Sequence, residues 1–209
     1  MTPGIVVIHM TAEKRAAPCA VAIGASAGGL RALRIILAAL PADLPAAVLV
    51  VLHLDPYGRS MLPTLLAGVT SLRVHDVREG GIVQAGRIYV AVPNHHLLVC
   101  EGRVQLAVSA PVHHVRPSVD RLFESVALGW LAAAVGVVLT GNGADGASGI
   151  AAIKRGGGCT IVQDPGESEY RGMPQAAIAT GAVDSVLPLI AIAPAVARAA
   201  AIAAAGGVA

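Results

Sequence analysis

The 209-residue sequence has few charges and almost no aromatic side chains. Charged residues make up 13% of the chain and aromatic residues 2%, whereas hydrophobic residues make up 55%. Aliphatic side chains of Ala, Val, Leu and Ile therefore have to build the core. The net charge is only +2, and no block of Lys and Arg occurs. These features argue against nucleic acid or an anionic membrane surface as a partner.

Paired cysteines and long hydrophobic runs are also missing. Three cysteines stand singly, which indicates small buried residues in a reducing compartment and no disulfide framework: Cys19, Cys100 and Cys159. The longest uncharged apolar stretch, residues 126–141, is shorter than the roughly 18 residues of a membrane-spanning helix. The N-terminal segment lacks the basic and apolar regions of a secretory signal. We therefore expect a cytoplasmic protein without membrane insertion.

Short runs of Val, Ile and Leu alternate with segments that favour helices. This alternation predicts a doubly wound α/β fold, in which a mostly parallel sheet has helices on both faces. The expected strands are residues 19–23, 47–53, 72–77, 86–92, 97–100, 104–108, 135–140 and 160–163. The expected helices are residues 29–40, 58–67, 118–133, 146–155 and 174–180.

The segment 86–108 departs from this alternation, because its strands have no helix between them. Glu101 and Gly102 are typical of a tight hairpin turn. We therefore expect an antiparallel hairpin at the edge of the sheet near residues 86–108.

A single serine stands among small residues in the segment 21–30, VAIGASAGGL. The string G-A-S-A-G around Ser26 satisfies the G-x-S-x-G pattern of a nucleophile elbow. Gly24, Ser26 and Gly29 also lie where a dinucleotide-binding fingerprint would have its three glycines. A third interpretation is a tight strand-to-helix turn in which small residues serve packing alone.

A serine nucleophile needs a histidine that accepts its proton and a carboxylate that orients the histidine. His53 ends the second expected strand, and Asp145 follows the seventh. Because the carboxyl ends of parallel strands meet at one edge of a sheet, Ser26, His53 and Asp145 are predicted to lie there together. The chain order Ser, His, Asp differs from that of the α/β-hydrolases. Each residue also has a structural interpretation: a packed turn, a polar strand end and a helix N-cap.

Two pairs of adjacent histidines suggest a metal site at first sight: His95 with His96, and His113 with His114. Adjacent residues of a strand point to opposite faces, and no cluster of Cys or carboxylates follows them. We therefore expect neither a metal nor another cofactor. Asp120 is predicted to lie in the first turn of a helix, where a negative charge stabilises the helix dipole.

Five motifs occur in order: IGASAGG at 23–29, HLDP at 53–56, RPSVD at 116–120, LTGNGADGA at 139–147 and GMPQAAI at 172–178. Together they resemble the catalytic domain of the chemotaxis protein-glutamate methylesterases, the CheB family. The resemblance implies a serine esterase that acts on glutamate γ-methyl esters of methylated chemoreceptor cytoplasmic helices or similar signalling proteins. Many members also deamidate receptor glutamines.

The resemblance also implies roles for particular residues. Ser26 matches the nucleophile, His53 the general base and Asp145 the orienting carboxylate. The backbone N–H groups of Ala27 and Asn142 match the oxyanion hole. The other residues expected to line the cleft are Gly28, Gly29, His96, Gly141, Gly143, Arg171 and Met173.

The resemblance divides the chain into three parts. Residues 1–18 are expected to form a poorly ordered leader, 19–190 the catalytic domain, and 191–209 an Ala-rich C-terminal helix or tail. A leader of this length is too short for the receiver domain of two-domain members, so we expect no receiver domain. Two other interpretations stay open: a non-catalytic scaffold that binds a receptor or another partner, and an esterase for small molecules.

Overall fold

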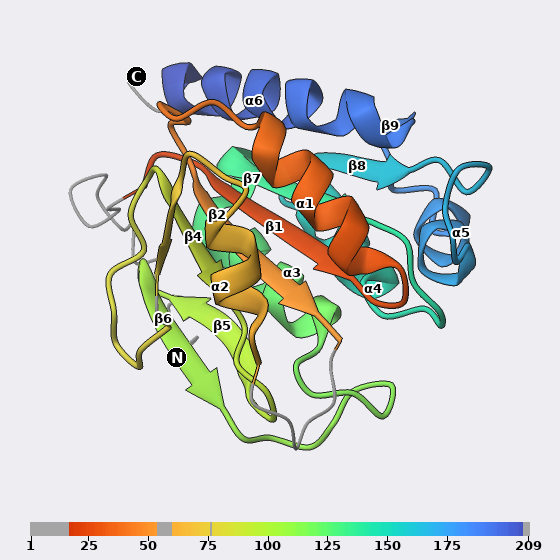
Figure 1. The fold of residues 1–209 in the computed structure, drawn as a ribbon, viewed down its shortest axis with the longest axis horizontal. Helices are drawn as coiled ribbons and strands as arrows, with labels where there is room; N and C mark the ends of the chain where they lie inside the picture. The colour runs from red at the N-terminus through yellow and green to blue at the C-terminus, as the bar shows by residue number, and fades with distance from the viewer. Residues whose placement is uncertain (1–16, 54–59, 76, 207–209) are drawn as a thin grey trace, which may run out of the picture.

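Figure 1 shows the fold of the chain in a computed structural model. The structure describes residues 17–53, 60–75 and 77–206. Most of the predicted leader, residues 1–16, lies outside the described residues.

A seven-stranded sheet forms the centre of the molecule, with all neighbouring strands parallel and the order β3-β4-β2-β1-β7-β8-β9. The strands are β1 Ala20–Ala25, β2 Ala47–Leu52, β3 Arg73–His75, β4 Arg87–Val90, β7 Ala134–Val138, β8 Cys159–Gln163 and β9 Ser185–Leu187. The three central strands β2, β1 and β7 are buried along their whole length. A sheet covered on both faces needs such uninterrupted aliphatic runs, and the predicted doubly wound fold is confirmed.

Helices cover the two faces of the sheet in two layers (Figure 1). One layer contains α1 Gly29–Ala39, α2 Leu62–Ala67 and α6 Leu189–Gly206. The other contains α3 Val119–Trp130, α4 Ala147–Arg155 and α5 Gly172–Ala179. Successive strand residues point to opposite faces, so β1 sends its Val and Ile side chains to the first layer and small alanines to the second.

The one phenylalanine and the one tryptophan of the sequence both lie in α3 and are buried. Phe123 and Trp130 belong to the same core as Ala20 and Ala22 of β1. The small side chains that β1 presents on this face leave part of the volume that the two large rings fill.

The predicted hairpin is confirmed, and its position is corrected. β5 His96–Cys100 pairs with β6 Arg103–Ala107 in antiparallel register, and both turn residues, Glu101 and Gly102, have positive φ. The pair is a separate two-stranded sheet and is not part of the main sheet. Within the expected segment, β4 belongs to the main sheet, where it is an interior strand that pairs in parallel with β2 and β3. The hairpin packs instead against α3, through Leu97, Val99 and Val104.

The Ala-rich C-terminal segment forms α6, which extends to Gly206; residues 207–209 lie outside the described part. Ile192, Val196 and Ala200 recur at four-residue intervals and pack into the core with α1. Among the described residues, α6 is the one helix that is long and apolar enough to span a membrane by length and composition.

We expect Phe123→Ala to lower the free energy of unfolding by about 3–5 kcal/mol, because it leaves a cavity between α3 and the sheet. Urea denaturation at neutral pH measures the change. Leu128→Ala on the same helix is the matched control, since this side chain is 83% exposed and its removal should cost less than about 0.5 kcal/mol. Similar losses for both variants would contradict this assignment of the core.

Candidate active site

The ends of three neighbouring strands bring candidate residues to one edge of the sheet. The Ser26 N–H donates to the Thr140 carbonyl at 3.0 Å, and the His53 N–H donates to the Ala25 carbonyl at 3.1 Å. Ser26 and His53 directly follow β1 and β2, and Thr140 is the second residue after β7. Neighbouring strands of a sheet are spaced by about 4.8 Å, so the three residues lie close together. The chain leaves β1 toward β2 and later returns on the other side as β7, and such switch points are where open α/β sheets bind ligands.

Ser26 lies in the turn between β1 and α1, packed against the glycine-rich loop that follows β7. A Cβ at Gly141 would lie 2.8 Å from the Ser26 Cβ and 2.2 Å from the Met173 Sδ. Gly28, at the start of α1, has a φ of 73°, which glycine adopts without strain. The missing side chain at Gly141 thus allows the loop backbone to reach the serine.

His53 and Asp145 are joined directly. The His53 Nε2 lies 2.8 Å from the Asp145 Oδ2, and the two side chains are 12% and 3% exposed. A carboxylate accepts hydrogen bonds, so Nε2 carries the proton of a neutral His53 ring. Nδ1 is then free of a proton, as a general base requires.

The Asp145 carboxylate is held at the amino end of α3. Oδ2 also accepts the Val119 N–H at 2.7 Å, while Oδ1 accepts the Asp120 N–H and the Ser118 hydroxyl, both at 2.9 Å. Burial by itself raises the pKa of Asp145, but the hydrogen bonds from His53, Asp120 and Val119 outweigh it and lower the pKa below its usual value. The carboxyl group is therefore ionised at neutral pH.

Asp120 makes the reciprocal contact with α4. Its Oδ1 accepts the N–H groups of Gly146 at 2.9 Å and Gly149 at 2.8 Å, and its Oδ2 lies 3.3 Å from the His113 Nε2. Burial raises the pKa of Asp120, and the neighbouring Asp145 carboxylate adds to the increase. The predicted place of Asp120 in the first turn of α3 is confirmed. The N-cap interpretation of Asp145 is corrected: it binds the start of α3, not of the α4 that follows it.

The two predicted oxyanion donors lie on the backbone beside Ser26. Ala27 follows the serine directly, and Asn142 follows Gly141 in the exposed part of the glycine-rich loop. No backbone group of the described residues accepts the N–H of Ala27 or Asn142. Gly143, next in this loop, has a φ of 82°. Neither N–H group is therefore engaged by the described backbone, as the predicted oxyanion role requires.

A cleft of about 730 Å³ opens beside Ser26 and His53. Its remaining lining residues are Gly28, Gly29, Leu30, Arg31, Arg34, Ile35, Ala38, Leu52, Val69 and Glu169. Gly28 and Gly29 were predicted here, whereas the wall formed by α1 was not. The sequence feature that predicts this wall is a four-residue spacing, which places side chains on one side of a helix. It is shared by Leu30, Arg31, Arg34, Ile35 and Ala38.

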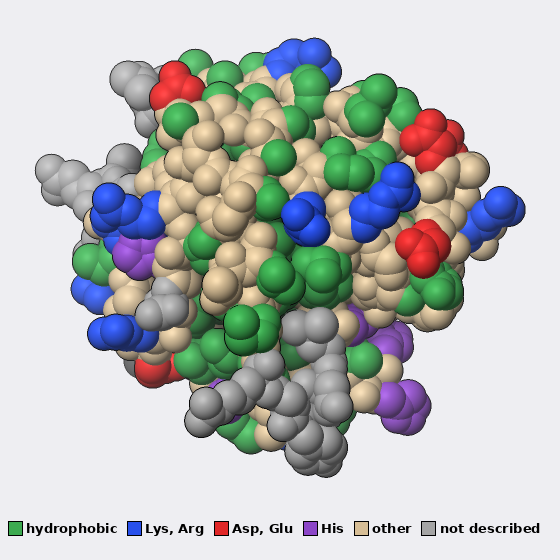
Figure 2. Space-filling view, in the orientation of Figure 1, with side chains coloured by type: hydrophobic (Ala, Val, Ile, Leu, Met, Phe, Trp, Pro, Cys, Tyr) green, Lys and Arg blue, Asp and Glu red, His purple; other side chains and the backbone are tan. Residues whose placement is uncertain are grey.

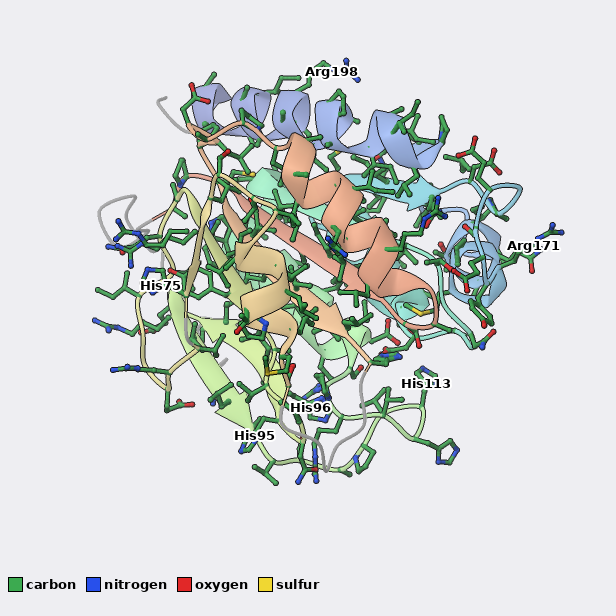
Figure 3. All side chains as sticks on the ribbon, viewed as in Figure 1. His75, His95, His96, His113, Arg171 and Arg198 are labelled. Carbon is green, nitrogen blue, oxygen red and sulfur yellow. The ribbon has the colours of Figure 1, made fainter. Side chains whose placement is uncertain are left out.

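Five of the seven residues expected to line the cleft are not among its lining residues: Gly141, Gly143, His96, Arg171 and Met173. His96 is fully buried behind Asp145: its Nδ1 accepts the Ser118 N–H, and its Nε2 bonds to the Ala110 carbonyl. Met173 is also fully buried, beneath Gly141, whose carbonyl accepts its N–H at 2.9 Å. Arg171 is exposed and extends away from the sheet edge in Figure 3.

Thr140 is a buried residue whose contacts were not predicted from the sequence. Its hydroxyl bonds to the carbonyls of Ala27 and Tyr170 and accepts the Tyr170 N–H. It thereby joins the serine turn to the segment before α5. In the described part of the chain, no group of three or more His, Cys, Asp or Glu side chains is placed to hold a metal ion.

Fold and site together define a class: a doubly wound α/β protein with a serine, a histidine and an aspartate at the carboxyl edge of its parallel sheet. The chain belongs to the CheB methylesterase family, whose model matches residues 21–196. This confirms the resemblance seen in the five motifs.

Curated relatives and a solved structure agree with this assignment. A protein-glutamate methylesterase/protein-glutamine glutaminase of Symbiobacterium thermophilum is 46% identical over 86% of this chain and 50% of its own length. One from Burkholderia lata is 46% identical over 88% of this chain and 54% of its own. The crystal structure of the Thermotoga maritima CheB methylesterase catalytic domain matches with a TM-score of 0.82 and 33% identity, over 86% of this chain and 97% of that one. The chain spans about half the length of the curated relatives it matches.

We expect Asp145→Asn to lower the free energy of unfolding by about 2 kcal/mol at pH 7, because hydrogen bonds to a buried charge are lost. The folded-state pKa of Asp145 is depressed, so this contribution is present above the unfolded-state pKa of about 3.9 and is lost as the pH falls through the folded-state value. The difference from the parent should therefore shrink in acid, as urea denaturation between about pH 7 and pH 3 can show.

Asp120→Asn is the matched control with the opposite sign. The raised folded-state pKa of Asp120 means that ionisation weakens the folded state, so this variant should gain stability relative to the parent as the pH rises. The same pH trend in both variants would contradict the assignment of the two carboxylates.

Proposed function

We propose that this chain is a serine esterase that hydrolyses glutamate γ-methyl esters on chemoreceptor-type signalling proteins in the cytoplasm. The observation that carries the proposal is the 2.8 Å bond between His53 and Asp145 in the cleft that also contains Ser26. The printed names of the curated relatives support the substrate class.

In the first half of the reaction, the His53 Nδ1 takes the Ser26 hydroxyl proton as Oγ attacks the ester carbonyl. The carbonyl oxygen becomes negative and accepts hydrogen bonds from the N–H groups of Ala27 and Asn142. Each of these hydrogen bonds lowers the activation free energy by about 3 kcal/mol. His53 then gives the proton to the methoxy oxygen, and the C–O bond breaks. Methanol leaves, and the glutamate acyl group stays esterified to Ser26.

In the second half, water takes the place of methanol. His53 accepts a proton from the water as the water oxygen attacks the acyl carbon. His53 then gives this proton to Ser26 Oγ as the bond between the acyl carbon and Oγ breaks. The free glutamate carboxylate is released. Asp145 keeps the ring oriented and stabilises the charged imidazolium. The lowered pKa of Asp145 keeps the carboxylate ionised for this role, and its four hydrogen bonds hold it in place.

Deamidation of a glutamine side chain is a second candidate reaction of the same site. The amide carbonyl would take the place of the ester carbonyl, and ammonia would leave in place of methanol. The glutaminase part of the relatives' names favours it. The alternatives of a non-catalytic scaffold and a small-molecule esterase predict different outcomes of the experiment below.

We expect the protein to release methanol from methyl-labelled chemoreceptor, and Ser26→Ala or His53→Ala to lower the rate by about a thousandfold or more. Labelled methanol in the supernatant measures the reaction. Ser148→Ala is the matched control, because this exposed serine lies on α4 outside the cleft, and its rate should equal that of the parent.

Release that persists in Ser26→Ala would overturn the proposed mechanism. If the parent releases no methanol but binds the receptor tightly, the scaffold is the correct interpretation. If it hydrolyses small esters only, the protein is a small-molecule esterase.

A further inference from the structure

The cleft beside Ser26 continues as a groove along α1. Leu30, Arg31, Arg34, Ile35 and Ala38 recur at four-residue spacing and form one wall. With a rise of 1.5 Å per residue, this stripe is about 12 Å long, which is about two turns of a helix. We call this surface, with Leu52 and Val69 on its other side, the α1 groove.

The α1 groove starts at the candidate reactive residues. Two residues separate Ser26 from the start of α1, and His53 follows Leu52 directly, so both lie at the amino end of the stripe. A protein segment that presents an ester to Ser26 therefore continues along the groove. The aliphatic side chains of Ile35, Ala38, Leu52 and Val69 give it an apolar floor.

Two arginines border this apolar floor, and both are exposed. Figure 2 shows basic side chains among hydrophobic ones on the face of the molecule that α1 covers. None of the ion pairs among the described residues includes Arg31 or Arg34. Arg31 shares a small hollow with Glu167 and Glu169, and Glu169 also lines the main cleft, beside Gly28 at the amino end of α1. Arg34, nearly one turn further along, does not line the small hollow.

We propose that the α1 groove binds a helical segment of the esterified protein, and that Arg34 selects segments with a carboxylate one to two turns from the ester. An apolar stripe two turns long fits an amphipathic helix, whose apolar side chains would rest on the groove floor. Along the axis of α1, Arg34 lies about 7.5 Å from Gly29, the first residue of the helix, which is close to Ser26. One helical turn advances 5.4 Å, so this distance corresponds to between one and two turns. A carboxylate three to seven residues from the ester would therefore face its guanidinium group.

This inference rests on the proposed function for the position of the ester, but its test does not depend on turnover. Two fluorescent helical peptides carry one glutamate γ-methyl ester each. One has Glu at three, four and seven residues on both sides of the ester, and the other has Gln at these positions. Fluorescence anisotropy gives the ratio of their dissociation constants in the Ser26→Ala background, and methanol release gives the ratio of kcat/KM with Ser26 present.

We expect the acidic peptide to bind about fivefold more tightly than the neutral peptide at low ionic strength, and the preference to fade with added salt. Arg34→Glu should reverse the preference, with most of the change in KM. Because both peptides are measured on each variant, a partial loss of folded protein cancels from the ratio. Arg198→Glu, on α6 at the upper edge in Figure 3, makes the same charge change outside the groove and should keep the parent's ratio.

Equal binding of the two peptides, or a preference that Arg34→Glu leaves unchanged, would overturn the inference. A reversal by Arg198→Glu would also overturn it, since net charge would then explain the effect. If neither peptide loses methanol while the binding preference follows Arg34, the proposed function fails and the groove assignment stands.

Discussion

The buried Asp145 carboxylate is the contact on which the arrangement of the candidate site depends. A charge removed from water is costly unless hydrogen bonds replace its hydration, and each oxygen of Asp145 has two donors. Three of these four donors come from the start of α3, so the position of that helix and the orientation of His53 are linked. Asp120 makes the equivalent contact with α4. The two helices therefore satisfy each other's amino ends, and the histidine is oriented by the same contacts that stabilise the fold.

Composition and architecture agree on the central strands. A parallel sheet with helices on both faces exposes little of itself to solvent, which is why 13% of charged residues suffices for a chain of this length. On β1 the alanines Ala20 and Ala22 face the layer that contains Phe123 and Trp130. The core therefore has space for large rings on one side of β1, and Phe123 and Trp130 occupy this space.

The sequence predicts those features that depend on local pattern. The long aliphatic strands, the Glu101–Gly102 turn and the common edge reached by His53 and Asp145 all follow from runs of apolar residues and their ends. The role of Ser26 remains a prediction from its motif. Strand β9 is only three residues long and was not predicted, because such a short run carries no periodic signal.

Other features depend on contacts between distant segments, which sequence pattern does not encode. Asp145 binds the start of α3, 25 to 27 residues away, and nothing in the glycine-rich motif specifies that partner. His96 and Met173 are buried because the hairpin and α5 pack inward. The α1 wall of the groove was missed because an exposed arginine at helical spacing resembles any solvated helix face.

The strand ends hold Ser26 and His53 through backbone hydrogen bonds to Thr140 and Ala25, whereas the groove wall is made of side chains on α1. The proposed chemistry and the proposed recognition therefore reside in separable parts of the chain. On this proposal, substitutions on the exposed side of α1 change which proteins are accepted and leave intact the backbone that fixes the serine and the histidine. A duplicated gene could in this way acquire a new target by drift on one helix surface, without passing through an inactive ancestor.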